Sequence, residues 1–148
     1  MKKSKAIVLF GRANTGKTTT LNLLIDKLIS KYGATTLMSI PSANANNDKA
    51  IAVKYNGLNI AIITEGDHAN ALDYYFGKII ECDIYICASR TKGSSVEYIS
   101  NRFLGNYIMW QEKWSISEQN LTSPVLKTLQ DEANDLQAEA LIKAINSI

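Results

Sequence analysis

One short pattern of glycine, lysine and threonine near the N-terminus constrains this chain more than any other feature. Residues 11–18 read GRANTGKT and fit the pattern G-x-x-x-x-G-K-[ST]. The unbroken apolar run just before it, residues 6–10, is typical of a strand buried on both faces of a sheet. Apolar side chains then recur at helical spacing, at Leu21, Leu24, Ile25 and Leu28. The sequence therefore predicts a strand, a glycine loop and a helix in that order, with the helix over residues 17–31.

The residue types in this segment suit the binding of a polyphosphate. Glycines let the backbone turn tightly, so that successive N–H groups converge on one anion. Lys17 adds a compact positive charge, the Thr18 hydroxyl suits Mg²⁺, and the following helix directs its N-terminus at the same anion. We expect every residue of the segment and the next threonine to contribute to cofactor binding: Gly11, Arg12, Ala13, Asn14, Thr15, Gly16, Lys17, Thr18 and Thr19.

The pattern and its strand–loop–helix setting resemble those of the P-loop NTPases, the superfamily that contains kinases, GTPases and ATPases. The resemblance covers about residues 5–30, and we identify no further family signature beyond it. It implies a three-layer α/β P-loop fold with a mostly parallel sheet, a nucleoside triphosphate as the bound partner and Mg²⁺ as a cofactor.

Length and composition fit one soluble domain. The 148 residues, 46% hydrophobic and 20% charged, are ordinary for a globular protein, and we expect residues 1–148 to form a single nucleotide-binding domain. No apolar run approaches the roughly 20 residues of a membrane-spanning helix, and we expect neither a signal peptide nor a membrane partner. Cys82 and Cys87 are too few for a disulfide scaffold, so we expect a cytoplasmic setting. The net charge of +2 gives no clear nucleic-acid signal.

Several further segments carry the patterns of strands and helices. Strands are predicted at residues 35–40, 50–55, 58–63, 84–88 and 107–110. Helices are predicted at residues 69–81 and 96–104. The pair Asn56-Gly57 between two apolar runs is a strong hairpin signal, so one strand should be antiparallel in an otherwise mostly parallel sheet.

The last helix and one loop complete the predicted organisation. Ser123 and Pro124 suit the start of a helix. Its apolar residues predict a packing stripe at Leu126, Leu129, Ala133, Leu136, Ala140, Leu141 and Ile145. Residues 42–48, rich in asparagine, are predicted to form a loop, and this loop could order over the nucleotide.

Acidic residues follow the second arm of the hairpin, in the run Thr64-Glu65-Gly66-Asp67-His68. The end of such a strand is where P-loop proteins keep the carboxylate that handles Mg²⁺, so Asp67 is our first candidate and Glu65 our second. The alternative is that Asp67 caps a helix starting near Ala69. His68 either contacts phosphate or substrate or is an ordinary surface histidine.

Cations follow the next buried strand. Arg90 is placed to stabilise charge in a transition state or to hold a substrate phosphate, with Lys92 beside it, whereas the alternative is a solvated loop. Trp110 and Trp114 either stack on a base or pack at the edge of the core.

We infer the base specificity from two differences between this chain and the pattern of one GTPase family. The loop is similar to the G-R-x-N-x-G-K-[ST] form of translation-factor GTPases, which resemble this chain also in a hairpin ahead of the acidic strand. Those proteins carry D-x-x-G where residues 64–67 read TEGD, and they read guanine with N-K-x-D, which this chain lacks. We therefore favour ATP over GTP.

These residues predict an ATP-binding protein that catalyses Mg²⁺-dependent phosphoryl transfer or ATP hydrolysis. The catalytic candidates are Lys17, Asp67 and Arg90, and the metal candidates are Thr18, Asp67 and Glu65. The acceptor is a water or a small molecule. The alternatives are a nucleotide-binding regulatory module with little turnover, read by a protein partner, and a GTP-binding switch.

Overall fold

A six-stranded sheet with the order β2-β3-β4-β5-β1-β6 forms the centre of the computed structural model, which describes residues 4–42, 47–116 and 123–148. The strands are β1 (Lys5–Phe10), β2 (Thr35–Pro41), β3 (Lys49–Tyr55), β4 (Leu58–Ile63), β5 (Ile84–Ser89) and β6 (Ile108–Glu112). Strand β3 is antiparallel to both of its neighbours, while the pairs β4–β5, β5–β1 and β1–β6 are parallel. The predicted α/β class and the mixed sheet are confirmed.

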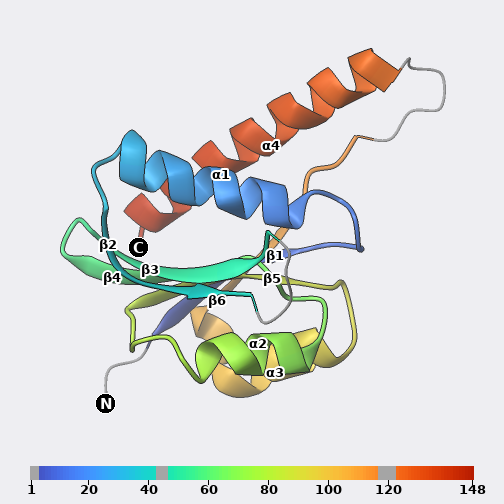
Figure 1. The fold of residues 1–148 in the computed structure, drawn as a ribbon. Helices are drawn as coiled ribbons and strands as arrows, with labels where there is room; N and C mark the ends of the chain where they lie inside the picture. The colour runs from blue at the N-terminus through green and yellow to red at the C-terminus, as the bar shows by residue number, and fades with distance from the viewer. Residues whose placement is uncertain (1–3, 43–46, 117–122) are drawn as a thin grey trace.

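Helices cover both faces of this sheet. Helices α1 (Lys17–Ser30) and α4 (Ser123–Asn146) lie on one face, and α2 (Ala69–Phe76) and α3 (Ser94–Arg102) lie on the other (Figure 1). A short 3₁₀ helix, η1 (Gly105–Tyr107), leads into β6. Each face has its own apolar core, and burial of these side chains is the main driving force for this layering.

Local sequence accounts for the central strands and for the hairpin. Strand β5 is buried along its whole length and β1 along its four central residues, as expected of strands covered on both faces. Asn56 and Gly57 join β3 to β4 with φ values of 50° and 78°. Both residue types tolerate positive φ, which a two-residue turn of this kind requires, so the predicted hairpin is confirmed.

Two helices begin or end at other residues than predicted. The helix predicted over residues 69–81 ends at Phe76, with Gly77 as its C-cap, because glycine is a poor helix former. The helix predicted over residues 96–104 begins at Ser94 and ends at Arg102, and Gly105 starts η1 instead of ending the helix.

The packing stripe predicted for the last helix is wrong in its middle. Leu136 is 62% exposed, and the side of α4 that faces the protein contains two polar residues. The buried residues are Asn134, Gln137, Ala138, Leu141, Ile142 and Ile145. A stripe chosen from apolar residues alone cannot find this side, since polar residues occupy its first part.

The topology brings the ends of four strands to one edge of the sheet. The mutually parallel strands β1, β4, β5 and β6 all end there, and this is the edge at which open α/β sheets place their ligands. Within the described ranges, none of the helices combines the length and the hydropathy needed to cross a membrane.

Candidate functional site

The glycine loop, residues 11–18, has the backbone shape of an anion-binding nest. Asn14 and Gly16 have φ values of 60° and 91°, whereas Thr15 between them does not have a positive φ. Alternation of this kind turns successive N–H groups toward one side. Among the described residues, the backbone N–H groups of residues 13–19 donate no hydrogen bond to another protein group. The loop therefore presents a row of free donors at the start of α1.

Lys17 lies at one side of this row. Its side chain is 6% exposed, and its ammonium donates to the carbonyl oxygens of Gly11 at 2.6 Å and Ser89 at 3.0 Å. Burial lowers the pKa of Lys17, the nearby Asp67 carboxylate opposes this shift and Arg90 adds to it. The cation is thus held in place by the ends of β1 and β5.

Asp67 joins the two cations predicted as catalytic residues. Its Oδ1 lies 3.5 Å from the Lys17 ammonium and accepts a hydrogen bond of 3.1 Å from Nε of Arg90. The structure therefore brings Lys17, Asp67 and Arg90 together. Asp67 does not cap α2, because the N-cap is the exposed His68 and the first N–H of the helix, that of Ala69, donates to the Ser94 hydroxyl at 3.1 Å.

Gly66 allows this close approach of the ends of β4 and β5. A Cβ added to Gly66 would lie 1.6 Å from the carbonyl oxygen of Ala88, which no side chain can tolerate. The glycine thus lets the backbone before Asp67 touch the backbone before Arg90.

Thr18 contacts an acidic residue that the sequence analysis missed. Its hydroxyl donates to Oδ1 of Asp48 at 3.0 Å, and the Thr64 hydroxyl donates to the same oxygen, also at 3.0 Å. Asp48 belongs to the loop predicted over residues 42–48, of which residues 43–46 lie outside the described residues. Asp48 and Thr18 are 30 residues apart in the chain, a separation that hides their contact from a motif search.

Glu65, the second metal candidate, turns toward α2. Its Oε2 accepts a hydrogen bond of 3.0 Å from the hydroxyl of Tyr75. Burial and this carboxylate raise the pKa of Tyr75 to about 12, so the tyrosine stays a donor. The described residues contain no group of three or more His, Cys, Asp or Glu side chains arranged to hold a metal ion.

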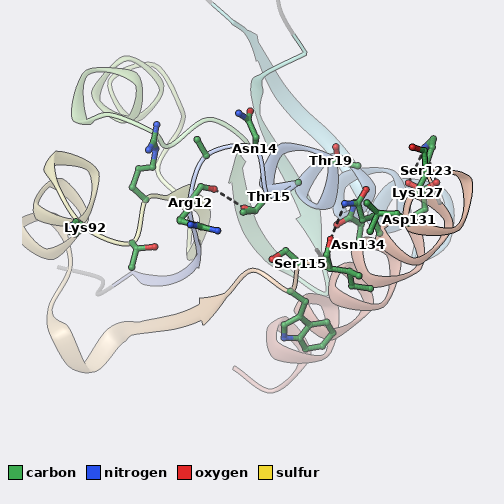
Figure 2. A pocket seen from close by; sticks show the side chains of 18 residues that line it. Arg12, Asn14, Thr15, Thr19, Lys92, Ser115, Ser123, Lys127, Asp131 and Asn134 are labelled. Carbon is green, nitrogen blue, oxygen red and sulfur yellow. Dashed lines mark hydrogen bonds and ion pairs between the residues drawn. The ribbon is translucent and has the colours of Figure 1, made fainter. Parts of the chain in front are cut away.

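Two hollows adjoin the glycine loop on opposite sides. The small hollow, of about 480 Å³, is lined by Lys17, Thr18, Asp48 and residues 64–67. The large hollow, of about 1310 Å³, lies between the glycine loop and α4 (Figure 2). Both hollows are lined by Asn14, Gly16 and Thr19, so they adjoin the same part of the loop. Arg90 and Lys92 line the large hollow.

Three further residues, Lys113, Asn134 and Gln137, support the loop from β6 and α4. Lys113, directly after β6, is 5% exposed, and its chain lies within 3.5 Å of where a Gly16 Cβ would be. Asn134 accepts a hydrogen bond of 3.2 Å from the Thr20 hydroxyl, and its amide lies against Gly16. Gln137 binds the backbone of Glu112 and Trp114 at 2.7 and 2.8 Å. Asn134 and Gln137 lie at helical spacing from the buried apolar residues of α4. This spacing is the sequence signal that could have revealed them.

Comparisons with protein-family models, with curated proteins and with solved structures find no match to this chain. Function is therefore inferred from the geometry and chemistry of the site itself.

Proposed function

We propose that this protein is a P-loop protein that binds ATP with Mg²⁺ and catalyses phosphoryl transfer or ATP hydrolysis. The observation that carries the proposal is the row of free backbone donors at residues 13–19, with the Lys17 ammonium at its side. Converging N–H groups at a helix start form an anion site, and a lysine adds the charge that the outer phosphates of a triphosphate need.

The oxygen ligands around Thr18 fit Mg²⁺. The Thr18 hydroxyl, the Asp48 carboxylate and the Asp67 carboxylate line the same small hollow. Mg²⁺ is usually held by one or two carboxylates, a hydroxyl, phosphate oxygens and waters, so a cage of three acidic residues is not required. When bound, the ion neutralises charge that develops on the phosphoryl group.

Lys17, Asp67 and Arg90 then have the following roles in the proposed reaction. Lys17 binds the outer phosphate and polarises it. Arg90, oriented by Asp67, lies close enough to Lys17 to stabilise charge on the transferred group. Asp67 lies where it can also orient the attacking oxygen of a water or of an acceptor hydroxyl. Catalysis by such a set is mainly positioning and neutralisation of charge.

The second candidate function is a regulatory module with little turnover. It is favoured by the internal bonds of Lys17, because an ammonium held by Gly11, Ser89 and Asp67 must exchange partners before it reaches a phosphate. Phosphate release with ATP and Mg²⁺ alone supports hydrolysis, release only with an added acceptor supports transfer, and tight binding without either supports the module.

Thermal denaturation with and without nucleotide tests the proposal. At 100 times its dissociation constant a ligand stabilises by about 2.7 kcal/mol, which corresponds to a rise in melting temperature of about 5–11 °C for a domain of this size. We expect this rise with ATP and Mg²⁺, and Lys17→Ala should abolish most of it. The matched control is Lys54→Ala, which removes an exposed lysine from β3 and should keep the full rise. A Lys17→Ala protein that responds like the wild type contradicts the phosphate role of Lys17.

A further inference from the structure

The large hollow is lined by polar and aromatic residues that phosphate binding alone would not require. Asn14 and Thr15 of the glycine loop line one side of it, and Asp131 and Asn134 of α4 line the other (Figure 2). Its volume of about 1310 Å³ exceeds the roughly 300–1,000 Å³ typical of small-molecule sites. The hollow therefore has room for a group much larger than a phosphate.

The order of the two hollows along the loop determines what the large one can hold. Lys17 and Thr18 line the small hollow, so a polyphosphate bound by these two residues would place one end there. The free donors of residues 13–19 continue from there to Asn14 and Thr19, which line both hollows. A chain of phosphates seated on these donors thus has its other end at the large hollow, where the group that it carries must lie.

Trp114 gives this hollow an aromatic surface on a fixed backbone. Its N–H donates to Gln137 at 2.8 Å, and its carbonyl accepts a hydrogen bond from the ammonium of Lys113. Its side chain is nevertheless 46% exposed, and the residue lines the hollow. An exposed aromatic ring on a backbone held by buried groups is a suitable stacking surface for a nucleobase.

Trp110, the other tryptophan of the chain, provides a contrast. It is 39% exposed, but it lies in β6, packs edge to face on Phe10 at 6.3 Å between ring centroids and does not line the hollow. Of the two tryptophans, only Trp114 is therefore placed to meet a ligand that extends from the glycine loop.

Polar groups on α4 complete the surface opposite the loop. Asn134 is 8% exposed, and its amide nitrogen donates to no described protein group although its oxygen accepts from Thr20. A ribose hydroxyl is a suitable acceptor for such an amide. Gln130 and Asp131 are already engaged, by the Ile116 carbonyl and by Lys127 respectively.

We propose that the large hollow is a nucleoside subsite, in which Trp114 stacks on a purine base and Asn134 binds the ribose of the triphosphate held by the glycine loop. The inference rests on the proposed function, since it takes the phosphates to be bound first. It adds a base-recognition surface built from the segment after β6 and from α4.

Calorimetric titration with two ligands distinguishes binding of the nucleoside from binding of the phosphates. ATP and inorganic tripolyphosphate, each with Mg²⁺, are titrated into the wild type, Trp114→Ala and Trp110→Ala. Trp114→Ala should weaken ATP about 5- to 150-fold, the range for loss of one stacked base, and leave tripolyphosphate within about twofold. Trp110→Ala should leave both affinities unchanged, and Trp114→Phe should retain most of the affinity for ATP.

The remaining outcomes of this titration contradict either the proposed function or the nucleoside subsite. If neither ligand binds the wild type, the proposed function fails and the subsite fails with it. If Trp114→Ala weakens neither ligand, or both equally, the proposed function stands and the subsite is wrong, and the hollow is then left to an acceptor beside Arg12, Arg90 and Lys92.

Fluorescence keeps the test valid even if Trp114→Ala does not fold. Trp110→Phe leaves Trp114 as the single tryptophan of the chain. ATP should change its emission while tripolyphosphate should not, and an identical response to both ligands would overturn the subsite.

Discussion

Two buried lysines lie on opposite sides of the glycine loop, and their surroundings differ in one respect. Lys17 is within 3.5 Å of a carboxylate and also donates to two backbone carbonyls. Lys113 donates to the Trp114 carbonyl, and burial alone lowers its pKa, to about 8. No carboxylate among the described residues forms an ion pair with Lys113.

The difference separates a buried charge that has a carboxylate partner from one that has none among the described residues. A buried cation without a partner destabilises a fold, whereas a cation beside a carboxylate is kept charged and oriented. The small hollow therefore has its charges arranged in advance. The side of the loop toward β6 instead has a buried positive charge whose described hydrogen-bond partner is a backbone carbonyl.

The largest expected effect concerns the stability of the fold and Lys113. In the unfolded chain a lysine keeps its proton up to about pH 10.5, but in the folded protein Lys113 releases it above about pH 8. The unfolded state thus binds more protons between these values, so stability should rise with pH across this window, by up to about 3 kcal/mol. Lys113→Met should flatten this rise and stabilise the protein at pH 7, as measured by urea unfolding.

Lys54→Met is the control for this experiment, because it removes an exposed lysine from β3. An equal change of slope in the two variants would show that Lys113 has no special role in the pH dependence.

The second effect concerns turnover and Asp67. Asp67→Asn keeps the shape of the side chain but removes the charge that orients Lys17 and Arg90. We expect kcat for phosphate release to fall about 10- to 100-fold, the range for loss of a group that positions a catalytic ligand. The affinity for ATP without Mg²⁺ should stay equal or increase, since a negative charge near the phosphates is lost.

Glu81→Gln makes the same change of charge at an exposed position ahead of the opposite end of β5 and should leave kcat unaltered. A loss of ATP affinity without a loss of turnover in Asp67→Asn would contradict the positioning role. Together with Trp114→Ala, this variant tests whether chemistry and base binding are divided between the two sides of the loop.

The smallest effect concerns the contact between α1 and α4 behind the large hollow. Glu139 accepts hydrogen bonds from Lys27, Lys31 and Tyr32, which lower its pKa to about 2. A lowered carboxyl pKa stabilises the fold above the ordinary value of 4.5, and this contribution is lost as the pH falls from 4.5 toward 2. Because the group is near the surface, Glu139→Gln should cost less than about 1 kcal/mol at pH 7.

The difference between this variant and the wild type should vanish near pH 2. Glu132→Gln, at an exposed position of the same helix, provides the baseline for the loss of one negative charge. Equal stability of the two variants at pH 7 would remove Glu139 from the contact.

Sequence patterns predicted the parts of the molecule in which neighbouring residues decide the structure. The glycine loop, the Asn56-Gly57 turn and the strand before it follow from local backbone preferences. The meeting of Lys17, Asp67 and Arg90 was also predicted, because parallel strands end at one edge of a sheet.

The parts that were missed depend on contacts between distant segments. Asn134 reaches Thr20 across 114 positions of the chain, so its partner cannot be inferred from neighbouring residues, and only its alignment with the buried apolar residues of α4 indicates that it is buried. The stripe through Leu136 failed for the same reason, since the neighbours of α4 and not its own composition decide which side is buried. Asp48 was missed because its segment has the composition of a loop.

The contact of Gly66 with the Ala88 carbonyl has a consequence for engineering this protein. A methyl group at position 66 would push β4 and β5 apart, which would separate Asp67 from Arg90 without altering either residue. Libraries that aim at a new specificity can therefore vary the walls of either cavity, but they should keep position 66 fixed. Any homologue with a larger residue there must use a different spacing of its acid and its guanidinium.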